Sequence, residues 1–198
     1  MEEKRLIAIT GGIGSGKSVV STILHIMGYP VYDCDSRAKK LMCTNINIKN
    51  DLISSFGEDC ISLEGKINTQ YISSIVFKDK TALLKINSIV HPRVKEDILL
   101  EYSKTKGVMF VETAILLQSN LLDIIDEVWL VDAPENVRIK RVMDRNSVTV
   151  EDVKKRINAQ CGQDYSVIKN LRTIINDGDY ALLPQISCLI SQFDEKKL

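Results

Sequence analysis

The sequence lacks the patterns that mark several protein classes. Its 198 residues include only 10 Gly and 4 Pro, and 44% are hydrophobic, which excludes a collagen-like or disordered chain. The 5 cysteines are irregularly spaced and form no CxxC pair, so neither a zinc site nor a disulfide framework is indicated. No apolar run approaches the roughly 20 residues of a membrane span, and Thr10, Gly11 and Gly12 interrupt the first apolar stretch too early for a secretory signal. We therefore expect a globular cytoplasmic protein with reduced thiols.

Net charge is also lacking. The 26 Lys and Arg residues balance 26 Asp and Glu residues, which gives a formal net charge of +0. Such a chain has no large field to attract a nucleic acid or an anionic membrane, so we expect neither as a partner. Any anion that the protein binds must be held by local groups.

Short apolar runs indicate the strands of an α/β fold. The run 6–9 is continuous and ends in glycines, which is typical of a strand that is buried on both faces and therefore parallel. Further runs are 29–32, 108–111, 128–131 and, more weakly, 173–175. Helical spacing follows the first two runs, at 18–27 and 36–42. We therefore predict a three-layer core with about five parallel strands.

Two segments interrupt this core. Between 45 and 106 the spacing predicts only helices, at 48–56, 70–77, 82–90 and 94–102, and Pro92 is expected to separate the last two. The ranges 136–145 and 150–159 predict a basic helical hairpin, in which Thr149 and Asp152 resemble a capping box. The expected organisation is a core (1–44, 107–135 and 172–198), a helical insertion (45–106) and a lid (136–171).

Residues 11–18, GGIGSGKS, fit the GxxxxGK[ST] pattern directly after a predicted strand and directly before a predicted helix. In that context backbone N–H groups turn inward around phosphate oxygens, and the helix N-terminus adds partial positive charge. Lys17 can reach the β- and γ-phosphates, and Ser18 can bind Mg²⁺. A glycine-rich turn with a solvent-facing lysine is the alternative. The pattern predicts a nucleotide site.

A pair of carboxylates, Asp33 and Asp35, follows the second predicted strand, where open parallel sheets place their ligands. One carboxylate there can accept the proton of an acceptor hydroxyl, and the other can hold a water on Mg²⁺. The alternative is that Asp35 only caps the next helix, with Ser36 as another possible cap.

Three arginines and one glutamate allow two interpretations each, whereas one histidine is expected to have a local structural role. Arg138, Arg141 and Arg145 share one helix face, which suits either a phosphoryl-stabilising lid or a solvated surface. Glu112, at a strand end, could order Mg²⁺ through water or cap a loop. His91 precedes Pro92 and is expected to end a helix.

Motifs spread over nearly the whole chain resemble the dephospho-CoA kinase family. They are Thr10 to Ser18, the Asp-Cys-Asp at 33–35, His91-Pro92, Val131 to Pro134, Arg141 with Arg145, Arg156 to Gln160, and Asn176-Asp177-Gly178. The resemblance implies a P-loop kinase with a helical CoA-binding insertion and a helical lid. It also implies the last step of coenzyme A synthesis, in which ATP with Mg²⁺ phosphorylates the 3′-hydroxyl of dephospho-CoA. We expect a monomer or a small homo-oligomer.

The resemblance also implies roles for single residues. Asp35 falls on the family's favoured base, Asp33 is left to metal or water ordering, and Arg141 falls on the lid arginine. Arg138 is unmarked, so we expect it to tolerate alanine. The nucleotide is expected to contact Gly12, Ile13, Gly14, Ser15, Gly16, Lys17, Ser18, Val19, Arg145 and Asn176, with the Asn-Asp-Gly turn beside the adenine.

The sequence departs from the family at three positions: Val19 replaces a common Thr, Gln118 replaces a Glu, and Lys39 replaces an Arg.

Two rival functions also fit a phosphate-binding loop. One is a P-loop kinase for another small alcohol or nucleotide, which a panel of acceptors would reveal. The other is a nucleotide-gated binding protein without transfer activity, which would have no need of a base at Asp35.

Overall fold

The computed structural model describes residues 4–62, 64–76, 79–160 and 164–194. Phe77, the predicted end of a helix, and Cys161 lie outside these residues. The chain divides into two compact units, one formed by Met1–Tyr32 with Thr105–Leu198 and the other by Asp33–Lys104. None of the described helices combines the length and the hydrophobicity that a membrane span requires.

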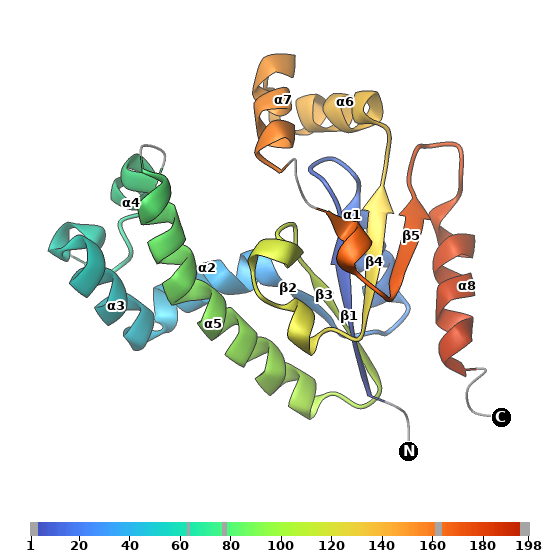
Figure 1. The fold of residues 1–198 in the computed structure, drawn as a ribbon, viewed down its shortest axis with the longest axis horizontal. Helices are drawn as coiled ribbons and strands as arrows, with labels where there is room; N and C mark the ends of the chain where they lie inside the picture. The colour runs from blue at the N-terminus through green and yellow to red at the C-terminus, as the bar shows by residue number, and fades with distance from the viewer. Residues whose placement is uncertain (1–3, 63, 77–78, 161–163, 195–198) are drawn as a thin grey trace. The chain divides into compact units, whose positions relative to one another are not determined.

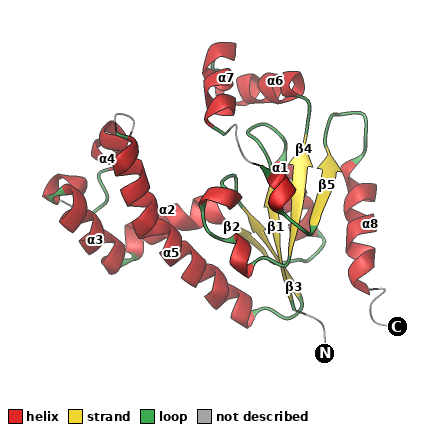
Figure 2. Cartoon of the chain, viewed as in Figure 1, coloured by secondary structure: helices red, strands yellow, loops and turns green. Residues whose placement is uncertain are grey.

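The first unit is an α/β sheet with its helices (Figures 1 and 2). Its strands are β1 (Arg5–Thr10), β3 (Val108–Glu112), β4 (Glu127–Asp132) and β5 (Leu171–Ile175), with the edge strand β2 (Val31–Asp33) ending where the second unit begins. Its helices are α1 (Lys17–Ile26), α6 (Glu135–Asn146), α7 (Val150–Ala159) and α8 (Leu182–Asp194). Short 3-10 turns lie at Leu116–Gln118 (η2), Leu122–Ile124 (η3) and Tyr165–Val167 (η4).

The strand order is β2-β3-β1-β4-β5, so β1 lies in the centre. The pairs β1–β3, β1–β4 and β4–β5 are parallel, with Ile7 opposite Phe110 and Ile9 opposite Trp129. Because parallel strands end at the same edge, the loops after β1, β3, β4 and β5 emerge together. The predicted α/β fold with five parallel strands is confirmed.

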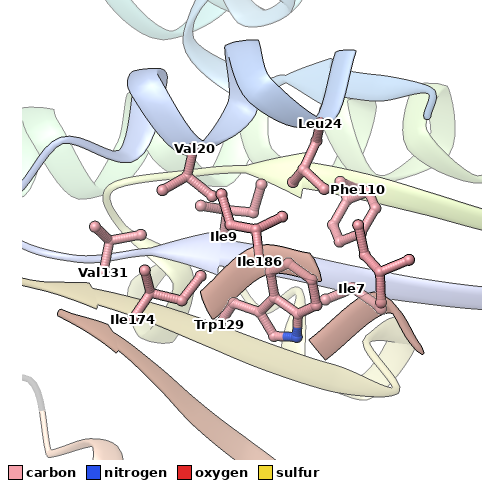
Figure 3. Close-up of a cluster of buried hydrophobic side chains, with 10 residues drawn as sticks. Ile7, Ile9, Val20, Leu24, Phe110, Trp129, Val131, Ile174 and Ile186 are labelled. Atoms are coloured by element: carbon pink, nitrogen blue, oxygen red, sulfur yellow. The ribbon is translucent and has the colours of Figure 1, made fainter. Parts of the chain in front are cut away.

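The core of this unit lies between one face of the sheet and two helices (Figure 3). Val20 and Leu24 of α1 and Ile186 and Ile190 of α8 pack against alternate residues of the strands. Those strand residues are Ile7, Ile9, Phe110, Trp129, Val131 and Ile174. Leu6 and Ala8, which point to the other face of β1, are also fully buried. Burial on both faces explains why this strand appears as a continuous apolar run.

The second unit is helical. It contains α2 (Cys34–Thr44), α3 (Ile46–Phe56), the 3-10 turn η1 (Glu58–Cys60), α4 (Thr69–Val76) and α5 (Lys80–Lys104). α2, α3 and α4 all contact α5. Arg37 of α2 donates to both carboxylate oxygens of Asp97 in α5, at 2.8 Å each, and to Glu101 at 3.3 Å. This forked contact fixes α2 along α5.

The predicted break at Pro92 is wrong. α5 continues through Pro92 and His91 as one helix of 25 residues. Its buried residues Ala82, Ile86, Val90, Val94 and Ile98 recur every four positions on both sides of the proline. Pro92 and Ser88, whose carbonyl loses its usual donor, are exposed, so water can satisfy that carbonyl. Continuous packing offsets the cost of the proline.

Candidate active site

The phosphate-binding loop, residues 11–18, joins the central strand β1 to α1. Gly16 is the N-cap of α1, has φ +98°, and offers no side chain to cap the helix. A Cβ atom at Gly16 would collide with Nδ2 of Asn176, so only glycine fits here. The pattern of glycines is therefore required by the backbone path of the loop.

This loop leaves backbone donors open for an anion. Within the described part of the chain, the N–H groups of Gly14, Gly16 and Ser18 donate to no acceptor. The first turn of α1 also contains no acidic residue. A helix N-terminus with open N–H groups and no compensating carboxylate attracts phosphate. The loop therefore fits the phosphates of a nucleotide.

Lys17 and Ser18 begin α1 and lie in the loop. The Lys17 ammonium donates to the carbonyl oxygens of Gly11 at 2.8 Å and Gly12 at 3.3 Å, so the lysine folds back along the loop. The Ser18 hydroxyl donates to Oε1 of Glu112, at the end of β3, at 2.8 Å. This contact brings an alcohol and a carboxylate together, and hard cations such as Mg²⁺ prefer oxygen ligands of this kind.

Asn176 connects the loop to the carboxyl ends of β4 and β5. Its Nδ2 donates to the Ser15 carbonyl at 2.8 Å, and its N–H donates to the Asp132 carbonyl at 2.8 Å. Arg141 of α6 donates to the Asn176 carbonyl at 2.8 Å and to its Oδ1 at 3.3 Å. Thus Arg141 and Asn176, both predicted site residues, lie together at the loop.

The turn after Asn176 is held by Asp177. Its carboxylate accepts the N–H groups of Asp179 at 2.9 Å and Tyr180 at 3.1 Å. The N–H groups of Tyr180 and Asp179 lower the pKa of Asp177, with a smaller contribution from the charge of Arg141. The turn therefore keeps a negative charge beside the site at neutral pH.

The hairpin of α6 and α7, residues 135–159, touches the loop at Ile13. In Figure 1 α6 follows directly from the arrowhead of β4. Arg138 of α6 donates from Nε to the Ile13 carbonyl at 2.9 Å. Gln160, the C-cap of α7, accepts the Ile13 N–H at 2.7 Å. The predicted Thr149 cap of α7 is confirmed, although Asp152 bonds the Thr149 hydroxyl rather than its N–H.

Tyr165, in η4, is a further residue near the loop that the sequence did not indicate. Burial raises the pKa of its phenol, and the Thr10 hydroxyl and the Arg138 charge oppose that rise. No motif contains Tyr165, and its position next to Thr10 depends on the folded path of the chain. Only the structure identifies it.

Asp33 and Asp35 belong to the second unit. Asp33, not Asp35 or Ser36, is the N-cap of α2, so the predicted alternative of an Asp35 cap is wrong. Asp33 Oδ1 accepts the N–H groups of Asp35 at 3.0 Å and Ser36 at 3.2 Å, and Oδ2 accepts the Ser36 hydroxyl at 2.6 Å. The helix starts two residues earlier than predicted, which places the cap at the strand end.

Other predicted site residues lie apart from these contacts. Arg145 donates to the neighbouring Asn146 at 3.2 Å, and Val19 is 50% exposed. Gln118 is exposed at the end of η2 and Lys39 is exposed on α2. Among the described residues no group of three His, Cys, Asp or Glu side chains could hold a metal ion. Any Mg²⁺ would therefore need ligands from the nucleotide as well.

Comparisons with known proteins agree with this geometry. The family model for dephospho-CoA kinase matches residues 5–181. A dephospho-CoA kinase from Bacteroides fragilis is 38% identical over 193 residues, covering 96% of this chain and 93% of that protein. A crystal structure of a Thermus thermophilus protein has a TM-score of 0.78 at 28% identity, covering 98% of each chain. Dephospho-CoA kinase from Campylobacter jejuni has the same fold, with a TM-score of 0.71 at 23% identity, covering 99% of this chain and 100% of that chain.

Proposed function

We propose a residue-level mechanism from the premise that the chain belongs to the dephospho-CoA kinase family. The protein transfers the γ-phosphoryl group of ATP to the 3′-hydroxyl of dephospho-CoA, which gives coenzyme A and ADP. The observation that carries this function is a complete phosphate-binding loop within a family match over residues 5–181. The rival functions have no comparable support, because both share only the loop.

The loop binds the phosphates of ATP. Phosphate oxygens accept hydrogen bonds from the N–H groups of Gly14, Gly16 and Ser18, and the N-terminus of α1 attracts their negative charge. Lys17 exchanges its bonds to the Gly11 and Gly12 carbonyls for phosphate oxygens. Because charge on the phosphoryl oxygens changes during transfer, an ammonium held there stabilises the transition state.

Asp35 accepts the proton of the acceptor hydroxyl. Asp33 already accepts three hydrogen bonds at the start of α2, whereas the exposed Asp35 carboxylate accepts none from the described residues. A general base needs a free lone pair directed at its substrate. The local contacts therefore favour Asp35 over Asp33 as the base.

Ser18 would hold Mg²⁺ through its hydroxyl, which Glu112 orients through their 2.8 Å contact. Asp33 would help to hold the ion through a water, because among the described residues its Oδ2 accepts only the Ser36 hydroxyl and retains an open lone pair. The ion supplies charge neutralisation for the β- and γ-phosphates when it is bound. The Ser18 contact supports a role for Glu112 beside the metal ligand over a role as a loop cap.

Arg141 stabilises charge on the transferred phosphoryl group. Its guanidinium is fixed by Asn176, which also holds the Ser15 carbonyl of the loop. Such a forked donor suits phosphate oxygens. Arg145 and Asn176 contact the nucleotide, with the Asn-Asp-Gly turn beside the adenine.

We place the reaction in the cytoplasm. The described cysteines, Cys34, Cys43, Cys60 and Cys188, are all free, which supports a reducing compartment. The formal net charge of +0 supports a small-molecule substrate rather than a nucleic acid. We propose a monomer or a small homo-oligomer, which sedimentation equilibrium would distinguish.

An ADP-release assay with several acceptors tests the function. We expect turnover with dephospho-CoA, and a product that mass spectrometry identifies as coenzyme A. Adenosine, shikimate and gluconate should give no more ADP than the reaction without an acceptor. Equal or faster release with one of these acceptors would support the rival kinase, and slow hydrolysis with every acceptor would support a binding protein.

A further inference from the structure

Ile13 is held from three directions at the tip of the phosphate-binding loop. Its N–H donates to Oε1 of Gln160 at 2.7 Å, and its carbonyl accepts Nε of Arg138 at 2.9 Å. Its side chain packs against a buried cluster of the α6–α7 hairpin, formed by Val142, Val153 and Ile157. One loop residue therefore completes the small core of the hairpin while both of its backbone polar groups are bonded by hairpin side chains.

The packing between α6 and the loop is close at the two glycines on either side of Ile13. A Cβ at Gly12 would lie 2.7 Å from Cζ of Arg138, and a Cβ at Gly14 would lie 2.6 Å from the Arg138 carbonyl oxygen. Arg138 is half-buried, unlike a side chain of a solvated basic face. The absence of a side chain at Gly12 and Gly14 therefore allows α6 to approach the loop, and Arg138 is part of this packing.

We propose that Ile13, Arg138 and Gln160 form a loop clamp, which holds the phosphate-binding loop in the shape that receives the nucleotide. Arg138 and Gln160 are then positioning residues, which act on ATP through the Ile13 peptide. The inference rests on the proposed function, because it requires that the loop binds ATP. It replaces the expectation that Arg138 is dispensable.

The physical reason is the flexibility of the loop. A segment rich in glycine loses much conformational entropy when it is ordered, and a ligand that must order it binds more weakly. Contacts that order the loop beforehand reduce this cost at binding. The contacts of the clamp join residues 125 and 147 positions apart, so the hairpin and the loop are ordered together.

The test uses three variants and a matched control. Gln160→Met keeps the length of the side chain but removes the acceptor for the Ile13 N–H. Arg138→Ala removes the donor to the Ile13 carbonyl, and Arg138→Lys keeps a donor at the same position. Lys140→Ala removes an exposed cation from the same helix and is the control. Each protein is titrated calorimetrically with ADP and Mg²⁺, and its unfolding temperature is measured with and without ADP.

We expect Gln160→Met to weaken ADP binding about fivefold, the order of one lost hydrogen bond. Arg138→Ala should weaken it about tenfold, and Arg138→Lys should recover part of that loss. The KM for dephospho-CoA at saturating ATP should be unchanged, and the rise in unfolding temperature on adding ADP should be smaller than in the wild type. Lys140→Ala should match the wild type in every measurement.

Two results would overturn the clamp. Unchanged ADP affinity with a lower unfolding temperature would mean that the contacts only stabilise the hairpin. Tighter ADP binding in Gln160→Met would mean that Gln160 competes with phosphate for the loop. If Arg138→Ala does not fold, Gln160→Met and Arg138→Lys still decide, because they act on the same peptide. A wild type that binds no nucleotide would overturn the proposed function itself, which distinguishes the two failures.

Discussion

At the scale of single residues, Asp33 and Asp35 stand two positions apart and have different surroundings. Both oxygens of Asp33 accept hydrogen bonds at the start of α2, whereas the Asp35 carboxylate projects from the first turn without a partner among the described residues. The cap satisfies N–H groups that a helix N-terminus would otherwise expose. Asp33 therefore caps α2 and keeps one open lone pair for a metal-bound water, whereas Asp35 keeps all its lone pairs for proton transfer.

Replacing each aspartate by asparagine separates these roles. We expect Asp35→Asn to lower kcat at least about 10²-fold, because the amide cannot accept a proton, with ADP affinity and unfolding temperature nearly unchanged. Asp33→Asn should raise the Mg²⁺ concentration required for turnover but keep the cap, since asparagine caps helices as well as aspartate does. Steady-state kinetics over a Mg²⁺ series measure both effects. If Asp35→Asn stays active while Asp33→Asn is inactive at saturating Mg²⁺, the two roles must be exchanged between these residues.

Lys17→Ala should lower kcat by about 10²-fold or more, because it removes a cation from charge that changes during transfer. In the structure its ammonium donates to the carbonyl oxygens of Gly11 and Gly12, which water can also satisfy, so circular dichroism and the unfolding temperature should stay close to those of the wild type. Turnover near the wild-type rate would contradict the assignment of the loop.

Arg141→Ala should lower kcat more than it weakens ATP binding, because its guanidinium is proposed to meet charge that develops in the transition state. Since Arg141 also bonds Asn176, some loss of affinity through the Ser15 contact is expected too. Comparison of kcat with the calorimetric affinity for ADP separates the two effects. An effect on affinity alone would make Arg141 a clamp on ground-state phosphates.

At the scale of the element, α5 shows that buried packing can override a local helix breaker. The every-fourth-residue row of buried side chains continues from Ala82 to Ile98 past Pro92. That regularity is present in the sequence, but a proline inside a helical pattern predicts a break. The deciding fact, that Pro92 faces solvent, depends on which side of the helix packs against α2, α3 and α4.

The same helix makes the stability of the protein depend on pH. Burial lowers the pKa of His91 below its ordinary value of 6.5, because it disfavours the charged imidazolium. The unfolded chain therefore binds a proton at His91 more readily than the folded chain does. The contribution of neutral His91 to the free energy of unfolding is complete above pH 6.5 and is lost as the pH falls through the lower folded-state pKa. Urea unfolding at about pH 7.5 and 5.5 should show a smaller loss for His91→Gln than for the wild type. His25→Gln, at an exposed position of α1, is the control, and equal losses in all three proteins would exclude His91 as the cause.

Other elements differ in how well the sequence indicates them. Strands β1, β3 and β4 are predicted within one residue of each bound, because double burial leaves an unbroken apolar run. α8 has an amphipathic pattern, yet it was not predicted, since Pro184 in its first turn and its position at the end of the chain obscure it. Its role becomes clear only when Ile186 and Ile190 are seen in the core.

At the scale of the whole molecule, the parallel sheet assembles the site. Topology brings Ser18 to Glu112 across 94 residues and Ser15 to Asn176 across 161 residues. The sequence is enough to identify the loop, because the residues that form it are consecutive in the chain. It could not identify Arg138 and Gln160 as partners of the loop, or place Tyr165 beside Thr10, because these contacts depend on how the hairpin and η4 return to the sheet.

Metal and nucleotide should bind together to the intact protein. The described residues offer no group of three His, Cys, Asp or Glu side chains that could hold a metal ion, and the Ser18–Glu112 pair alone is too small a ligand set to hold Mg²⁺ tightly. We therefore expect that the ion binds together with the nucleotide, so that excess chelator abolishes phosphoryl transfer. Without nucleotide, the chelator should leave the unfolding temperature unchanged, whereas Mg²⁺ should increase the stabilisation that ADP gives. A fall in the unfolding temperature of the nucleotide-free protein on chelation would reveal a structural metal, and undiminished turnover would remove Ser18 from its proposed role.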